Sequence, residues 1–194
     1  MQSRADLPPD LRRRFRTGRP ALDLVHTGGA GDLSAWEIVH NIEDLRRWLT
    51  VILEVDVISA EPADLPRMRA LRAAITRAAF DAAAGAPLRA EEVAAVNAVA
   101  EGPSLIPVLH ADGTRGYRDP TAAAALSTLA RDAIDLFSGP LAGRIRVCAA
   151  EDCGLLFVDA SRPGRRRWCS MDRCGNLAKV RRYRGSDPVD DGER

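Results

Sequence analysis

All four cysteines of the chain lie within residues 148–174, in the pattern C-x4-C-x15-C-x4-C. Two closely spaced pairs separated by a loop are typical of a tetrahedral zinc site, in which each pair supplies two thiolates. We therefore expect one structural Zn²⁺ bound by Cys148, Cys153, Cys169 and Cys174. Disulfides, free thiols and an iron centre are the alternatives, and soft sulfur ligands without a nearby histidine favour zinc.

The charge of the chain is concentrated around these cysteines. Residues 144–184 carry eleven basic and four acidic side chains, a net charge of +7, whereas the whole chain has a net charge of only +1. A strongly basic segment beside a mildly acidic remainder is typical of proteins that bind a polyanion.

Composition favours a helical protein. Apolar residues make up 46% of the 194 residues but aromatic residues only 5%, and alanine is abundant. The N-terminus is charged without an apolar run behind it, and no stretch is long enough to span a membrane. We therefore expect a soluble cytoplasmic protein with no membrane association, in which reduced cysteines favour metal binding over disulfides.

The order of patterns predicts an α+β fold in four parts. These are a polar, solvated arm (1–18), a mainly helical domain with a few short strands (19–140), a small treble-clef-like or ribbon-helix zinc module (144–184) and a disordered acidic tail (185–194). The alternative for the arm is a basic patch formed by Arg12, Arg13, Arg14 and Arg16. Apolar periodicity and turn residues predict helices over 41–54, 65–85, 87–99 and from Asp119-Pro120 to Gly139-Pro140. Short strands are expected at 22–26, 104–110 (a hairpin with the segment at Tyr117) and 155–158.

Within the zinc module, the segment after Cys174 reads as a helix with Leu177 and Val180 on its inner face. Trp168 is expected to pack over the module. The basic residues form a loop group and a helix group that zinc could bring to one surface, and arginine is well suited to phosphates. We expect DNA contact from Arg165, Arg166, Arg167, Lys179, Arg181, Arg182 and Arg184. The alternative is that these side chains are solvated or pair with acidic residues of the chain itself.

Three motifs carry a family resemblance: R-x-C-x4-C-x3-F-x-D-x-S, R-R-x-C-S-M-x-x-C-G-N and K-x-R-R-Y-R, all within residues 146–184. Together they resemble the CGNR zinc finger. LDLVHT at residues 22–27 is similar to the opening of the ABATE domain, which is described as a stress-induced transcription regulator. The resemblance implies DNA binding by the finger and sensing by the N-terminal domain. The chain departs from the family at Leu177, where the motif has arginine, and at His26, where asparagine is usual.

Few patterns point to catalysis, and we expect no enzymatic activity. The three histidines are scattered, and HTGGAGD lacks the lysine and spacing of a phosphate-binding loop. Asp23, His26 and Thr27 could line a pocket for a small-molecule effector. The sequence therefore predicts a transcription regulator, with homodimerisation as an option. The alternative is a protein-interaction or small-molecule-binding protein in which the zinc module is only a structural brace.

Overall fold

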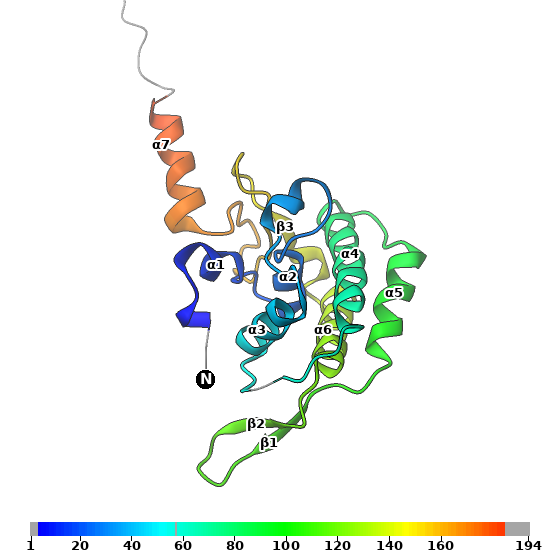
Figure 1. Cartoon of the computed structure of the whole chain (residues 1–194). Coiled ribbons are helices and arrows are strands. Elements are labelled where there is room, and N and C mark those ends of the chain that lie inside the picture. The colour runs from blue at the N-terminus through cyan, green and yellow to red at the C-terminus, as the bar shows by residue number, and fades with distance from the viewer. Residues whose placement is uncertain (1–3, 57, 185–194) are drawn as a thin grey trace, which may run out of the picture.

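The computed structural model describes residues 4–56 and 58–184, with side chains through Arg181. The body, residues 19–140, contains three mutually packed helices, α4 (Asp64–Ala83), α5 (Ala90–Ala100) and α6 (Ala122–Ser138), with α5 at the outer edge (Figure 1). Helices α2 (Pro20–Val25) and α3 (Ile42–Leu53) pack against both α4 and α6. Buried alanines allow these helices to approach closely, among them Ala74, Ala125, Ala130 and Ala133. The expected α+β class, mainly helical with a few short strands, is confirmed.

Side-chain caps set where two of these helices begin. Asn41 caps α3, because its side chain accepts a hydrogen bond from the backbone N–H of Asp44 at 3.0 Å. For α6 the cap is Thr121, which accepts from the N–H of Ala124 at 3.1 Å. The start predicted at Asp119-Pro120 therefore lies two residues too early.

The strand predicted at residues 22–26 is wrong, since this segment forms helix α2. Pro20 occupies the first turn, where a missing N–H costs no helical hydrogen bond. Every residue from Ala21 to Val25 is buried. The apparent alternation therefore came from a helix surrounded by protein on all sides, not from a strand with one solvated face.

The expected solvated arm is also wrong, because residues 4–18 pack on the body as η1 (Arg4–Asp6) and α1 (Pro9–Arg14). Phe15 is 1% exposed, and its ring meets that of Trp48 edge to face with centroids 6.0 Å apart. The Arg4 guanidinium donates to the carbonyls of Phe15 (2.7 Å) and Ile52 (3.1 Å). One aromatic anchor and one arginine therefore hold this N-terminal segment. The predicted tail, residues 185–194, lies outside the described residues.

The predicted hairpin at residues 104–117 is confirmed as β1 (Ile106–Leu109) and β2 (Arg115–Arg118). Its turn is held by the Asp112 carboxylate, which accepts from the backbone N–H (2.9 Å) and hydroxyl (2.7 Å) of Thr114. The hairpin extends away from the helices, at the opposite end of the molecule from α7 (Asn176–Arg184) (Figure 1).

A second antiparallel hairpin opens the zinc module, residues 144–184. It consists of β3 (Ile145–Val147), which the sequence pattern did not reveal, and β4 (Leu156–Val158), which was predicted. It follows η3 (Ala142–Arg144) and precedes η4 (Met171–Gly175) and α7. Ile145, Leu156 and Val158 belong to the main hydrophobic core, so the module is built onto the body. Among the described residues, no helix combines the length and apolarity that crossing a membrane requires.

Candidate metal centre and nucleic-acid interface

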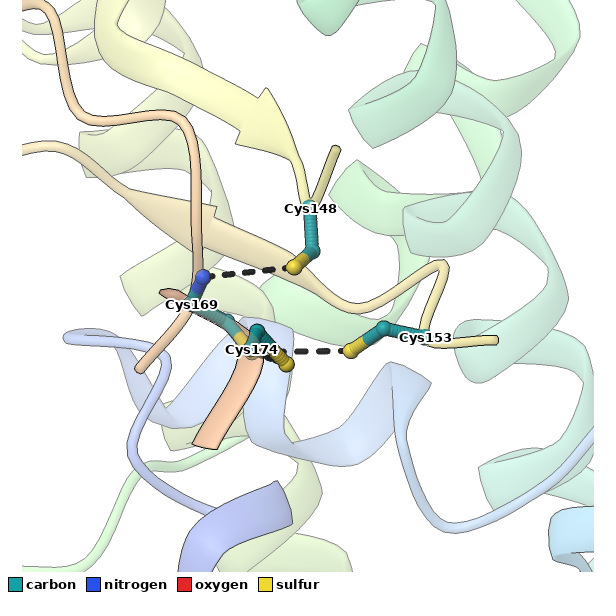
Figure 2. A group of neighbouring side chains, drawn as sticks. All are labelled: Cys148, Cys153, Cys169 and Cys174. Carbon is teal, nitrogen blue, oxygen red and sulfur yellow. Dashed lines mark hydrogen bonds between the residues drawn. The ribbon is translucent and has the colours of Figure 1, made fainter. Parts of the chain in front are cut away.

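The β3–β4 hairpin supplies one pair of cysteines, and η4 with the segment just before it supplies the other (Figure 2). Cys148 directly follows β3, and Cys153 lies in the turn that leads to β4. Cys169 precedes η4, and Cys174 lies within η4, next to the start of α7. The four Sγ atoms all lie within 4.8 Å of one another. The chain therefore folds its two short-spaced pairs into one cluster.

The sulfur distances fit a tetrahedral metal ion. Cys169 Sγ lies 3.5 Å from Cys153 Sγ and 3.7 Å from Cys174 Sγ. Zinc–sulfur bonds of about 2.3 Å in a tetrahedron place sulfurs about 3.8 Å apart, whereas a disulfide bond is about 2.05 Å. The four cysteines are positioned to bind one metal ion, and this donor set fits structural zinc. All four ligands come from the protein, so the ion would hold the hairpin against η4 rather than offer an open position.

Backbone hydrogen bonds shape the first knuckle, residues 148–155. The N–H of Cys148 donates to Leu155 O at 2.8 Å, and that of Cys153 donates to Ala150 O at 3.1 Å. Gly154 takes a φ of +61°, a conformation that glycine adopts without steric cost. Trp168 packs against the small buried cluster that Cys148 and Cys174 form with Leu155 and Phe157. Its contacts agree with the packing role expected for it.

Asp159 organises the loop that carries the arginines. Its buried carboxylate accepts from the backbone N–H of Ser161 (3.0 Å), the Ser161 hydroxyl (2.6 Å) and the backbone N–H of Arg166 (2.9 Å). The hydrogen bond from the Ser161 hydroxyl, followed by that from Arg166, lowers the pKa of Asp159 to about 2. The arginine loop, residues 162–167, is therefore tied down at both ends by one ionised side chain.

The loop arginines do not all face the same way. Arg165 and Arg167 are exposed, and the Arg167 guanidinium lies 5.3 Å from the ring centroid of Trp168. Arg166 instead turns onto its own module: its Nε donates to Trp168 O at 2.8 Å and its Nη2 to Cys169 O. Its guanidinium also lies 4.9 Å from the ring centroid of Phe157. Arg166 therefore braces the second cysteine pair.

Helix α7 shows a similar division. Lys179 is exposed, whereas Arg181 forms ion pairs with Glu151 (3.3 Å) and Asp152 of the first knuckle. The hydrogen bond from Arg181 to Asp152 raises the arginine's pKa. The side chains of Arg182 and Arg184 lie outside the described residues.

The apolar face predicted for α7 is not an inner one. Leu177 is 45% exposed and Val180 is 46% exposed. Helix α7 projects from the body (Figure 1), and both side chains stay partly in solvent although Leu177 also borders a cavity. The helix is anchored instead by Cys174 at its start and by the Arg181 ion pairs.

Asp23, His26 and Thr27 do not line a common pocket. Thr27 is buried and bonded to Leu24 O at 2.7 Å, and His26 Nε2 lies 2.9 Å from Leu156 O. Burial lowers the pKa of His26 to about 4. Asp23 is held by Thr17 and Arg4, and burial raises its pKa to about 6 despite the opposing charge of Arg4. His26 and Thr27 are therefore held within the core, and Asp23 borders a cavity on the N-terminal segment.

A cavity that sequence patterns did not indicate lies beside the zinc centre. It has a volume of about 400 Å³ and is bordered by α1, the first knuckle and α7, with Arg13 and Trp36 in its wall. Trp36 ends η2 (Gly31–Trp36), and its carbonyl accepts from Arg14 at 2.9 Å. The arginines at residues 12–16 lie close to this cavity, but their spacing along the chain does not indicate which segments fold against them.

The fold and site define a class of protein: a helical domain with a four-cysteine zinc module built onto it. Residues 18–140 match ABATE, described as a putative stress-induced transcription regulator, and residues 144–185 match the CGNR zinc finger. The chain therefore belongs to the ABATE family and carries a C-terminal CGNR zinc finger. A search of curated proteins finds no match to the chain.

Proposed function

We propose that this protein is a non-enzymatic transcription regulator that binds DNA through its zinc module. The observation that carries the proposal is a set of exposed cations around the metal centre. Among the residues with described side chains, none of these cations has a carboxylate partner; they are Arg162, Arg165, Arg166, Arg167, Arg173 and Lys179. They belong to a segment with a net charge of +7.

The proposed mechanism assigns different tasks to the basic residues. Arg165 and Arg167 present donors for phosphate oxygens, which arginine binds in a bidentate manner. Arg166 and Arg181 hold the loop and α7 in place through contacts within the module. Helix α7 projects from the module and carries an asparagine together with apolar and basic residues. Helices with such residues can enter the major groove of DNA. Zinc, when bound, supplies the cross-link that keeps loop and helix together.

In this proposal an effector binds in the cavity between the N-terminal segment and the zinc module. The cavity of about 400 Å³ beside the first knuckle touches both α1 and α7, so a ligand there would contact the DNA-binding module directly.

A homodimer would double the number of bases that the protein reads, because one small zinc module reads few bases. Light scattering of the zinc-loaded protein measures the oligomeric state.

The test is fluorescence anisotropy of zinc-loaded protein with a labelled random duplex at about 50 and 200 mM salt. We expect binding that weakens steeply with salt and disappears after chelation. Arg165→Ala/Arg167→Ala should lower the salt slope by about 1.8, or about 0.9 per phosphate contact. The matched control is Arg69→Ala/Arg118→Ala, which removes two exposed arginines on α4 and β2.

The competing function is a structural brace or protein-docking module. The main observation in its favour is that the β3–β4 hairpin contributes to the core of the body. Absence of duplex binding at low salt, or equal losses in the test and control variants, would support this reading and contradict DNA binding by the arginine loop.

A further inference from the structure

A basic cavity lies on the N-terminal segment, away from the four cysteines. This N-terminal cavity is bordered by η1, α1 and the start of α2, and has a volume of about 530 Å³. Its wall contains four arginines, Arg4, Arg12, Arg16 and Arg19, and a single carboxylate, Asp23. The volume lies within the usual range for small-ligand sites.

Two of the four arginines already have anionic partners. Arg4 pairs with Asp23 at 2.5 Å. Arg19 pairs with Asp132 at 2.9 Å and with Asp135 at 2.6 Å. These two guanidiniums are therefore neutralised within the fold and shape the wall.

The other two, Arg12 and Arg16, are uncompensated. Among the described residues neither has a hydrogen-bond or ion-pair partner, and the Nε of Arg12 is buried without one. A buried donor left unpaired costs free energy, which an acceptor entering the cavity would recover. Fixed positive charge with planar paired donors is the arrangement that protein sites use for phosphate.

The cavity also adjoins the zinc module. The carbonyl of Thr17 accepts from the N–H of Val158 in β4 at 2.8 Å. A Cβ placed on Gly18, a residue of the cavity wall, would lie 3.5 Å from the Cβ of Val158. The arginine loop begins four residues after Val158, so phosphate in the cavity would lie on the side of the body that meets the module.

We infer that the N-terminal cavity binds a phosphate group through Arg12 and Arg16. The phosphate can belong to a small phosphorylated molecule or to the backbone of DNA. The inference rests on the N-terminal segment alone and does not require the zinc module to bind DNA.

Two measurements on the zinc-loaded full chain separate these sources. The first is calorimetric titration with inorganic pyrophosphate, and the second is the salt dependence of duplex binding. For a small-molecule site, Arg12→Ala/Arg16→Ala should weaken pyrophosphate binding at least about tenfold. For a DNA contact, the same variant should lower the salt slope by about 1.8 without pyrophosphate binding to the wild type.

The controls separate a site from general charge and from misfolding. Arg12→Lys/Arg16→Lys keeps both charges and should keep most of the binding, and Arg69→Ala/Arg118→Ala should change neither measurement. Equal effects of the test and control variants would overturn the inference. So would an Arg12→Ala/Arg16→Ala variant that equals the wild type both in pyrophosphate binding and in the salt dependence of duplex binding. A wild type that binds pyrophosphate but no duplex would refute the proposed function while supporting this cavity.

Discussion

His26 links the body to the zinc module through a single uncharged contact. Its Nε2 hydrogen-bonds Leu156 O at 2.9 Å, while its Nδ1 is buried without a partner. A proton on Nδ1 would place an uncompensated charge in the core, beside Arg14. The family usually has asparagine here, which can donate the same kind of hydrogen bond without titrating.

This arrangement makes stability depend on pH. Because the pKa of His26 falls from 6.5 to about 4 on folding, only the unfolded chain binds the proton between these values. The contribution of His26 to stability is therefore lost as pH falls through this window. Asp23 acts in the opposite direction: its pKa is raised to about 6, so its contribution falls as pH rises from about 4 to 6.

Replacing His26→Asn should remove the loss of stability that His26 causes at low pH and leave the opposite contribution of Asp23 unchanged. We expect the free energy of unfolding of the wild type, relative to the variant, to fall by about 2 kcal/mol between pH 7 and pH 5. Urea unfolding of both proteins with excess zinc measures this difference, and the comparison cancels the acid sensitivity of the metal centre. A difference that stays constant with pH would show that His26 is not buried in its neutral form.

At the scale of elements, α7 is held at its ends and open along its length. Cys174 fixes its start and Arg181 ties its last turns to the first knuckle, while Leu177 remains 45% exposed. The family's arginine at this position would therefore project into solvent or toward a ligand. The leucine costs the fold little and removes one cation from the surface.

Leu177→Arg should therefore strengthen duplex binding if α7 faces DNA. One added phosphate contact should steepen the salt slope by about 0.9. Leu177→Gln is the matched control, because it is polar and uncharged at the same exposed position. An equal gain from both variants, or none from either, would mean that this face of α7 does not meet phosphates.

At the scale of the whole molecule, body and zinc module share one core. Ile145 and Leu156 are fully buried in it, and Thr17 and His26 bond to β4. Loosening the module therefore exposes apolar surface of the body as well. Zinc binding and folding of the entire chain should be coupled.

Chelating zinc should lower the melting temperature of the body as well as that of the module. A Trp36→Phe/Trp168→Phe variant leaves Trp48 as the sole tryptophan, buried on α3 at 6% exposure. Its melting temperature, followed by fluorescence, should fall by at least about 5 °C on chelation, which for this chain length corresponds to about 2 kcal/mol. An unchanged transition would mean that body and module unfold independently.

Local sequence patterns were sufficient for several elements of this fold. The apolar stripe of α3, the turn of the β1–β2 hairpin and the paired cysteines act over a few residues, so each can be read without knowing its neighbours. The sequence patterns did not predict the correct element where a segment is completely buried or where its burial depends on contacts with distant residues. Helix α2 is buried on every side, β3 is too short to show a period, and the N-terminal segment depends on the contact of Phe15 with Trp48.

The metal donors and the local concentration of positive charge could be predicted from the amino-acid sequence, because both depend on residue type and spacing. The role of each basic side chain became clear only from the folded structure. Arg165 and Arg167 are exposed without a carboxylate partner among the described residues, Arg166 and Arg181 are used within the module, and Arg12 and Arg16 line a cavity. The physical reason is that a guanidinium's role depends on the partners within about 4 Å of it, and folding brings those partners from distant parts of the chain.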